Sequence, residues 1–501
     1  MPGPFRKMYD DWLYTGPRFL KWTLRWMRKS FDTLDNGELT MKTKKPSQTG
    51  RRGFIKSLGG ATAAMSALPA LADAQATAPP RKAGAKYMGD FAAPKIEKVR
   101  IAIIGVGARG RGHASRLASI EGTEIVAISD LYEDLAKRSE QRVAANGHKP
   151  KLYFGDPDLY RTMLAEVKPD MVVVATPWED HAPMGVAAMQ AGAHVFIETP
   201  IAVTLDEMWQ LVNTSEETAR HCMHMENVCY GREELLYLNM VRQGVIGELL
   251  HGEAAYIHDL RRQMKQVERG TGSWRTHHYI RRNGNLYPCH GLGPVAQYMS
   301  LARTEDTFGR LVSFSSPSRA RALYAKANFP ADHEWNTEEF QAGDINTSII
   351  KTALGRTIMV QWDEQSPRPY SRHNLIQGTK GTLAGFPNRF AIEGVNSFHE
   401  WTEGEAWEEF VAQYEHPLIK RVGELAKKMG GHGGMDFIEL YRMVECLQNG
   451  LPLDQNVYEG CFWSSVGPLS EKSVSEGGAP QEFPDFTRGN WKTTKPLGIV
   501  A

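Results

Sequence analysis

Cysteine is scarce in this 501-residue chain. The sequence holds 5 cysteines, an odd number, without the CxxC pairs of zinc sites or the density of a disulfide scaffold. This pattern excludes a small disulfide-stabilised domain and a cysteine-rich zinc fold. We therefore expect mostly small buried hydrophobic side chains at these positions, which are Cys222, Cys229, Cys289, Cys446 and Cys461.

An excess of charge of either sign is also missing. The 59 lysines and arginines nearly balance the 58 aspartates and glutamates, which leaves a formal net charge of +1. Binding to a phosphate backbone depends on a surplus of basic side chains. The composition therefore gives no reason to expect nucleic acid, and it fits a small, roughly neutral partner better.

The apolar segment 58–72 is too short for a comfortable membrane span, and its flanks indicate an export signal instead. Residues 49–57 read TGRRGFIKS, which is a twin-arginine pattern, and Ala72-Asp73-Ala74 supplies an A-x-A cleavage site. We expect the twin-arginine export machinery to deliver the chain to the periplasm or the medium. Translation could start at Met1 or at Met41, and the sequence leaves this choice open.

A chain of 501 residues exceeds what one hydrophobic core usually organises, so two folded domains are expected behind the signal. After a linker rich in Pro, Ala and Lys, buried-strand patterns alternate with helical ones. Strands are predicted at 99–104, 124–129, 171–175 and 194–197, and helices at 132–146, 183–191 and 205–219. This alternation predicts an α/β Rossmann domain, a doubly wound parallel sheet with helices on both faces.

Beyond about residue 224 the pattern changes to alternating strands and Gly-containing turns. Strands are predicted at 249–257, 345–352 and 357–362, and helices at 407–414 and 434–448. We expect an α+β domain with a mainly antiparallel open sheet. A homodimer through the open face of that sheet is a further hypothesis.

A nucleotide-binding turn follows the first strand directly. Gly105-Val106-Gly107-Ala108-Arg109-Gly110 is a complete GxGxxG, whose glycines allow a tight turn, close approach of a pyrophosphate, and close packing of helix on strand. Asp130 closes the next strand, where its carboxylate can accept hydrogen bonds from the ribose hydroxyls. Because Asp130 would repel a 2'-phosphate, the motif favours NAD over NADP.

Two more predicted strand ends face the same crevice, because ligands of such sheets bind beyond the carboxyl ends of the strands. One carries Thr176 to His181, in which Trp178 and His181 are candidates for contact with the nucleotide. Packing is the alternative role for Trp178. The other carries Glu198-Thr199-Pro200.

The order of these motifs resembles the glucose-fructose oxidoreductase and inositol dehydrogenase superfamily. Its members usually read Glu-Lys-Pro where this chain has Glu198-Thr199-Pro200, and their lysine serves dehydrogenase chemistry. Thr199 therefore argues against an ordinary sugar dehydrogenase.

Four downstream segments carry a closer resemblance. They are Glu226-Asn227-Val228-Cys229-Tyr230, the run WRTHHY at 274–279, the run NLYPCHGLGP at 285–294, and Arg368-Pro369-Tyr370. Together with the nucleotide motif they are similar to glycoside hydrolase family 109, the NAD-dependent alpha-N-acetylgalactosaminidases. The resemblance implies hydrolysis of terminal alpha-N-acetylgalactosaminides through oxidation at carbon 3, elimination, addition of water and reduction, with no net redox.

The resemblance also implies roles for individual residues. Sugar-binding roles fall on Arg275, Tyr287, Tyr370 and Tyr230, and cofactor contacts fall on Glu198 and Asn227. His290 is the candidate base for the carbon 3 hydroxyl, since imidazole titrates near neutrality. Tyr230 is the candidate for carbon 2 with help from a nearby positive charge, Tyr287 is a further catalytic candidate, and the choice among the tyrosines stays open.

No metal site is predicted. His277 and His278, adjacent on a predicted strand, would point to opposite faces, and no carboxylate or cysteine stands at ligand spacing.

The predicted organisation has five parts. They are a leader with the export signal at 1–76, a linker at 77–95, an NAD-binding Rossmann domain at 96–223, a substrate-binding α+β domain at 224–475, and a surface-wrapping tail at 476–501. Two other function classes stay open. One is a periplasmic NAD(P)-dependent sugar oxidoreductase, and the other is a silent sugar-binding protein that keeps NAD as a structural element.

Overall fold

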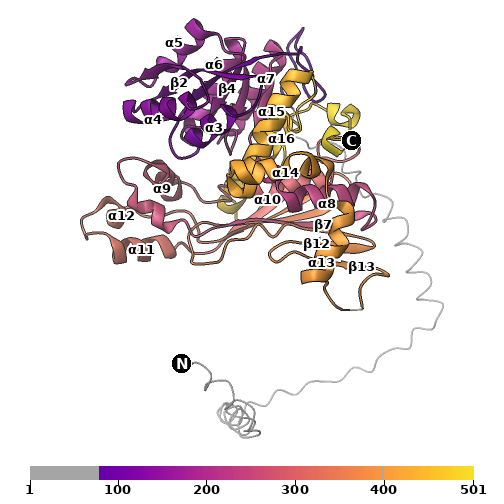
Figure 1. The fold of residues 1–501 in the computed structure, drawn as a ribbon. Coiled ribbons are helices and arrows are strands. Elements are labelled where there is room, and N and C mark those ends of the chain that lie inside the picture. Colours follow the sequence, from indigo (N-terminus) through magenta and orange to yellow (C-terminus); the bar gives the residue numbers. More distant parts are fainter. Residues whose placement is uncertain (1–77, 398, 501) are drawn as a thin grey trace, which may run out of the picture. The chain divides into compact units, whose positions relative to one another are not determined.

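The computed structural model describes residues 78–397 and 399–500, in which two sheets organise the chain (Figure 1). The predicted leader and its twin-arginine motif lie outside these residues. The strands of the first sheet are β1 (Val99–Ile104), β2 (Thr123–Asp130), β3 (Lys151–Phe154), β4 (Met171–Val174), β5 (His194–Ile197) and β6 (Cys222–His224). All pairs are parallel, and the order β3-β2-β1-β4-β5-β6 is that of a doubly wound nucleotide-binding sheet, as predicted.

Helices follow the strands of this sheet in alternation. They are α3 (Gly110–Leu117), α4 (Glu133–Ala144), α5 (Leu159–Val167), α6 (Trp178–Gln190) and α7 (Leu205–Thr218). Every residue of β4 and β5 is buried, which explains why these strands are continuous apolar runs rather than alternating ones. The sequence also marks one helix start clearly, because Thr204 and Glu207 form a capping box at α7.

The second sheet has eight strands in the order β13-β12-β11-β7-β10-β9-β8-β14. Their bounds are β7 (Leu249–Ile257), β8 (Phe308–Ser315), β9 (Asn346–Thr352), β10 (Thr357–Asp363), β11 (Leu375–Gly378), β12 (Gly381–Ala384), β13 (Arg389–Ile392) and β14 (Gln481–Glu482). Only the β7–β10 pair is parallel, so the prediction of a mainly antiparallel sheet is confirmed for the described chain.

The second half of the chain also contains helices. They are α8 (Arg232–Arg242), α9 (Thr271–Arg281), α10 (Cys289–Tyr298), α11 (Ala320–Asn328), α12 (Glu334–Thr337), α13 (Gly404–Val411), α14 (Pro417–Met429), α15 (Met435–Asn449) and α16 (Val457–Ser475). Short 3-10 turns are η2 (Asn227–Tyr230), η3 (Arg261–Lys265), η4 (Ala412–Tyr414), η5 (His432–Gly434), η6 (Asn490–Thr493) and η7 (Gly498–Val500). Figure 1 shows α15 and α16 beside the first sheet, and they contact α3, α7 and β6. The end of the chain thus helps to build the nucleotide half.

Helix α16 was not predicted from the sequence. Most of its residues are buried, so it lacks the continuous polar face that makes a helix recognisable by periodicity. The local signal was present at its start, where Asn456 and Glu459 form a capping box.

The strand predicted around His277 and His278 is wrong. Both residues lie on helix α9, so they do not point to opposite faces of a sheet as assumed. The packed residues Arg275, His278 and Tyr279 recur at the three- and four-residue spacing of one helix face.

The two ends of the described chain pack onto the body. In the predicted linker Met88 is buried and Tyr87 stacks on Tyr458, with ring centroids 4.9 Å apart. The tail adds β14 to the edge of the second sheet and buries Phe483 and Phe486. The domain boundaries and the homodimer stay predictions.

Among helices in the described ranges, none has both the length and the apolarity that a membrane span requires.

Candidate active site

The glycine turn between β1 and α3 is shaped for close backbone approach. Gly105 has φ +83°, and a Cβ there would lie 2.7 Å from the carbonyl oxygen of Ala175. A Cβ on Gly110 would overlap the carbonyl oxygen of Gly105, so helix and strand can meet only with glycine here. A Cβ on Gly107 would meet nothing within 4 Å, which leaves that side of the backbone open to a ligand.

Asp130 lies at the end of β2 beside this turn. Its Oδ2 accepts a hydrogen bond from the backbone nitrogen of Val106 at 2.7 Å, and its Oδ1 accepts one from Tyr132 at 2.9 Å. Burial raises the pKa of the carboxyl, and these two hydrogen bonds oppose the rise. The carboxylate therefore lies where the ribose of a dinucleotide is expected, next to the glycines.

Arg109 reaches from the glycine turn toward acidic side chains. Its Nε donates to Glu198 Oε1 at 2.8 Å and its Nη1 donates to Asp436 Oδ2 at 3.0 Å. The same Glu198 oxygen lies 2.6 Å from His113 Nε2. Burial alone would raise the pKa of Glu198, but Arg109 and His113 hold it well below its usual range. Glu198 is therefore an ionised carboxylate beside the turn.

Asn227, in the turn that follows β6, joins this charged group. Its Nδ2 donates to Asp436 Oδ1 at 2.6 Å, while its own Oδ1 is buried without a hydrogen-bond partner in the described structure. Asp436 comes from α15, so that helix closes the nucleotide turn from the C-terminal side. The free amide oxygen of Asn227 is available to a bound cofactor.

Trp178 and His181 begin helix α6, and both are buried. His181 Nδ1 lies 2.7 Å from the carbonyl oxygen of Pro200, and its Nε2 lies 3.0 Å from that of Thr176. His181 therefore connects two strand-end loops. Trp178 faces the second half of the chain, where its ring stacks on Tyr287 at 5.7 Å between centroids.

His290 and Glu226 form a hydrogen-bonded pair. His290 Nδ1 lies 2.7 Å from Glu226 Oε1, and the His290 side chain keeps 15% of its surface exposed while Glu226 is fully buried. His290 lies in the first turn of α10, and Glu226 lies just before η2. A buried carboxylate that holds one ring nitrogen leaves the other free to exchange a proton with a ligand.

Tyrosine rings surround His290. The His290 ring centroid lies 4.9 Å from that of Tyr287 and 5.1 Å from that of Tyr256, and Tyr370 lies 6.2 Å beyond Tyr256. Tyr287 and Tyr256 are buried, whereas Tyr370 is 41% exposed. We call His290, Tyr287, Tyr256 and Tyr370 the aromatic cluster. It leads from the protein surface at Tyr370 to the interior at Tyr287.

Arg275 brings a positive charge to this cluster. Its guanidinium carbon lies 5.0 Å from the Tyr287 ring centroid, and its Nη1 donates to the buried Glu364 at 3.1 Å. Burial opposes the charge, but Glu364 outweighs that effect and raises the pKa of Arg275 above its ordinary value. Arg275 therefore stays charged beside Tyr287.

One contact joins the aromatic cluster to the nucleotide side. The hydroxyl of Tyr287 is hydrogen-bonded to the hydroxyl of Thr199, which follows β5 and is adjacent to Glu198. The groups around the glycine turn and the groups around His290 are thus parts of a single site.

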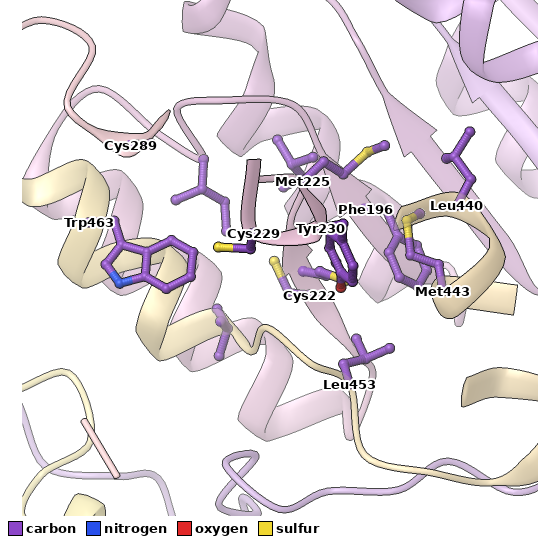
Figure 2. Close-up of a cluster of buried hydrophobic side chains, with 14 of the residues drawn as sticks. Phe196, Cys222, Met225, Cys229, Tyr230, Cys289, Leu440, Met443, Leu453 and Trp463 are labelled. Carbon is purple, nitrogen blue, oxygen red and sulfur yellow. The ribbon is translucent and has the colours of Figure 1, made fainter. Parts of the chain in front are cut away.

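The structure does not bring Tyr230 to this site. Tyr230 is 1% exposed, and Figure 2 shows it in a hydrophobic cluster with Phe196, Met225, Leu440, Met443 and Leu453. Its hydroxyl donates to Asp454 Oδ2 at 3.3 Å. Burial and Asp454 raise its pKa well above that of a free phenol. This placement contradicts the expected role of Tyr230 as the base at carbon 2.

Comparison with known proteins agrees with this geometry. Residues 230–493 match the model of the glycosyl hydrolase 109 C-terminal domain, and residues 99–225 match the oxidoreductase family with an NAD-binding Rossmann fold. The chain is 61% identical over 475 residues to glycosyl hydrolase family 109 protein 1 of Akkermansia muciniphila, covering 90% of this chain and 98% of that protein. It is 54% identical over 457 residues to a glycosyl hydrolase family 109 protein of Shewanella baltica, covering 90% and 98%.

The chain belongs to glycosyl hydrolase family 109. The resemblance expected from the sequence is thereby confirmed, and the protein is a glycosidase built on an NAD-binding oxidoreductase fold.

Solved structures share the fold at low identity. Levoglucosan dehydrogenase in complex with NADH and levoglucosan aligns with a TM-score of 0.59 and 17% identity, covering 77% of this chain and 100% of that chain. Scyllo-inositol dehydrogenase of Lactobacillus casei with NAD(H) and scyllo-inositol aligns with a TM-score of 0.55 and 14% identity, covering 77% and 99%. In this chain the open backbone at Gly107 and the carboxylate of Asp130 also fit NAD. NAD is therefore the cofactor of this family 109 protein.

Sequence reasoning missed three side chains that complete the site. Glu226 was quoted only as the start of a motif, Glu364 pairs with Arg275, and Tyr256 lies against His290. A signal existed for Tyr256, because alternation along β7 places it on the same buried side as Gly252 and Ala254. Glu226 and Glu364 had no such signal, since their partners lie 64 and 89 residues away.

Two glycine variants should distinguish an effect on protein stability from an effect on NAD binding. Gly110→Ala should destabilise the protein even without NAD, because its Cβ overlaps the backbone of Gly105. Gly107→Ala should leave the cofactor-free protein as stable as wild type. The same substitution should weaken the binding of NAD, because only the ligand needs the space beside Gly107. Thermal denaturation with and without added NAD measures both effects. Equal NAD affinity in Gly107→Ala and wild type would contradict the assignment.

Proposed function

We propose that this family 109 protein hydrolyses terminal alpha-N-acetylgalactosaminides by an NAD-dependent cycle without net redox. The observation that carries the proposal is the pair of His290 and Glu226 in one site with Thr199, at the strand edge where NAD belongs. A partly exposed imidazole held by a buried carboxylate beside a redox cofactor is suited to removing a hydroxyl proton from a sugar. The family relationship supports the choice of glycosidic substrate.

Bound NAD supplies a hydride acceptor for carbon 3 of the sugar, the same hydride at the end of the cycle, and a positive charge beside the substrate. The residues of the chain manage the protons. His290 takes the proton of the carbon 3 hydroxyl through its Nε2, while Glu226 holds Nδ1 and fixes the ring orientation. The proton on carbon 2 becomes acidic once carbon 3 is a ketone, and its loss allows the bond to the aglycone to break. Water then adds at carbon 1 while a proton returns to carbon 2, before carbon 3 is reduced again.

We assign the proton transfer at carbon 2 to Tyr287 in place of Tyr230. Burial raises the pKa of Tyr287, and the charged Arg275 offsets only part of the rise, so the assignment rests on position: the Tyr287 hydroxyl bonds Thr199 and its ring lies against His290. The same guanidinium can stabilise the negative charge that develops on the substrate oxygen. Tyr256 and Tyr370 are then free to bind hydroxyls or the acetamido group.

A sugar oxidoreductase is the competing function, since the fold is shared with levoglucosan dehydrogenase. The contact of Thr199 with Tyr287 favours the glycosidase, because a threonine offers no ammonium group for dehydrogenase chemistry at that position.

The purified protein should cleave para-nitrophenyl alpha-N-acetylgalactosaminide without added NAD, because the cycle returns its hydride and consumes no cofactor. Nitrophenol release and the absorbance of reduced nicotinamide are followed together. Nitrophenol without accumulating NADH is the expected result. NADH formed in step with an oxidised sugar would identify an oxidoreductase, and neither signal across several sugars would identify a binding protein.

Removing either partner of the His290–Glu226 pair should lower kcat more than it changes KM. His290→Ala should lose roughly 10²–10⁴-fold in kcat, as for a general base, with NAD still bound. Glu226→Gln should lose less, because the imidazole remains but is held less firmly. Glu216→Gln is the matched control, since Glu216 is equally buried but pairs with Arg81 and Arg488 outside the site. Full activity in His290→Ala would remove His290 from the mechanism.

We further propose export to the periplasm or the medium by the twin-arginine pathway. The support is the sequence TGRRGFIKS at 49–57 and the A-x-A site at 72–74. Replacing Arg51 and Arg52 together by lysine should leave the protein uncleaved in the cytoplasm, whereas the unaltered chain appears in the periplasmic fraction. Cell fractionation and blotting measure export. Unchanged export of the double variant would disprove this route.

A further inference from the structure

Behind His290 lies a buried group of three side chains that the mechanism uses only in part. His224 ends β6, Glu226 precedes η2, and Cys289 begins α10. One ligand atom of each residue lies within 4.8 Å of the corresponding atoms of the other two. All three side chains are fully buried. We call them the His-Glu-Cys cluster.

The cluster contains polar atoms that lack partners. Neither ring nitrogen of His224 has a hydrogen bond within the described part of the chain, and Glu226 Oε2 also lacks one. Cys289 Sγ has only a long contact of 3.7 Å with Ser464 Oγ. Leaving a buried polar group unsatisfied destabilises the folded protein. A histidine with both nitrogens free, close to a carboxylate that keeps one free oxygen, is therefore suited to bind a further ligand.

Two glycines shape the walls around the cluster. A Cβ on Gly293 of α10 would lie 2.9 Å from Glu226 Cγ, and a Cβ on Gly460 of α16 would lie 2.5 Å from His224 Cβ. Both helices thus come close to these side chains only because they have glycine there. The packing holds His224 and Glu226 in place from two sides, as a rigid site requires.

The three types of donor atom indicate a metal ion as the bound species. An imidazole nitrogen, a carboxylate oxygen and a thiolate sulfur supply three of the four ligands that Zn²⁺ prefers at about 2.0–2.3 Å, and a water molecule would supply the fourth. Binding would form a zinc–sulfur bond and release the thiol proton to solvent.

We propose that the His-Glu-Cys cluster binds one zinc ion behind the active site. Coordination through Glu226 Oε2 leaves Oε1 free to hold His290 Nδ1, so the ion would fix the carboxylate that orients the base. The ion would be a structural and positioning element, and the substrate would not touch it. Only a small rearrangement is needed, because the ligand atoms already lie within 4.8 Å of one another.

Metal content and a cobalt spectrum test this site on the NAD-loaded protein. The chain is treated with chelator, incubated with Zn²⁺ or Co²⁺, and freed of unbound metal. Wild type should retain one zinc per chain, and its cobalt form should show a thiolate-to-cobalt charge-transfer band in the near ultraviolet. Cys289→Ser should lose that band and bind zinc at least about 100-fold more weakly, because even outer partners of a metal ligand contribute about 10–100-fold.

Cys446→Ser is the matched control. Cys446 is equally buried, but its thiol contacts the carbonyl oxygen of Pro452 outside the cluster, so this variant should keep zinc and the cobalt band. NAD content reports whether each variant is folded. If Cys289→Ser fails to fold, the cobalt spectrum of wild type alone decides whether the cluster binds metal through a thiolate.

Two outcomes would overturn the zinc site. One is a wild-type protein that retains no more zinc than Cys289→Ser, and the other is a cobalt form without a thiolate band. Neither readout uses glycosidase activity, so failure of the zinc site and failure of the proposed function are distinguishable.

Discussion

The parallel arrangement of the first sheet is the constraint on which the site depends. Because all six strands run in one direction, their carboxyl ends meet at a single edge. The glycine turn, Asp130, Glu198 and His224 all follow or end strands at that edge, although up to 119 residues of sequence separate them. No local sequence feature would bring these groups together without the sheet.

The second half of the chain completes the site by supplying partners to that edge. Asp436 of α15 neutralises Arg109 and holds Asn227, and Tyr287 reaches Thr199. Each contact pairs a group of the first sheet or its loops with one far along the chain. The charges are balanced within the protein, so the ionised Glu198 and the charged Arg275 can both be buried at acceptable cost.

The sequence predicted what local patterns and the family resemblance determine. Strands with continuous apolar residues, the glycine turn and Asp130 were all recognisable, because each depends on neighbours within a short segment. Helix α16 was missed since it is buried on all sides, and α9 was mistaken for a strand. The predicted role of Tyr230 was wrong for a different reason. Its environment is set by Asp454 and by α15, more than 200 residues away, which a motif around Tyr230 cannot reveal.

Glu226 shows how packing can assign two tasks to one side chain. A carboxylate has two oxygens, and here one accepts a hydrogen bond from His290 while the other has no partner in the described structure, with His224 and Cys289 close to the carboxylate. In a medium of low dielectric constant, whatever binds the second oxygen changes how strongly the first can hold the imidazole. The orientation of the base at the substrate is therefore linked, through a single buried group, to the occupancy of a site that no substrate reaches.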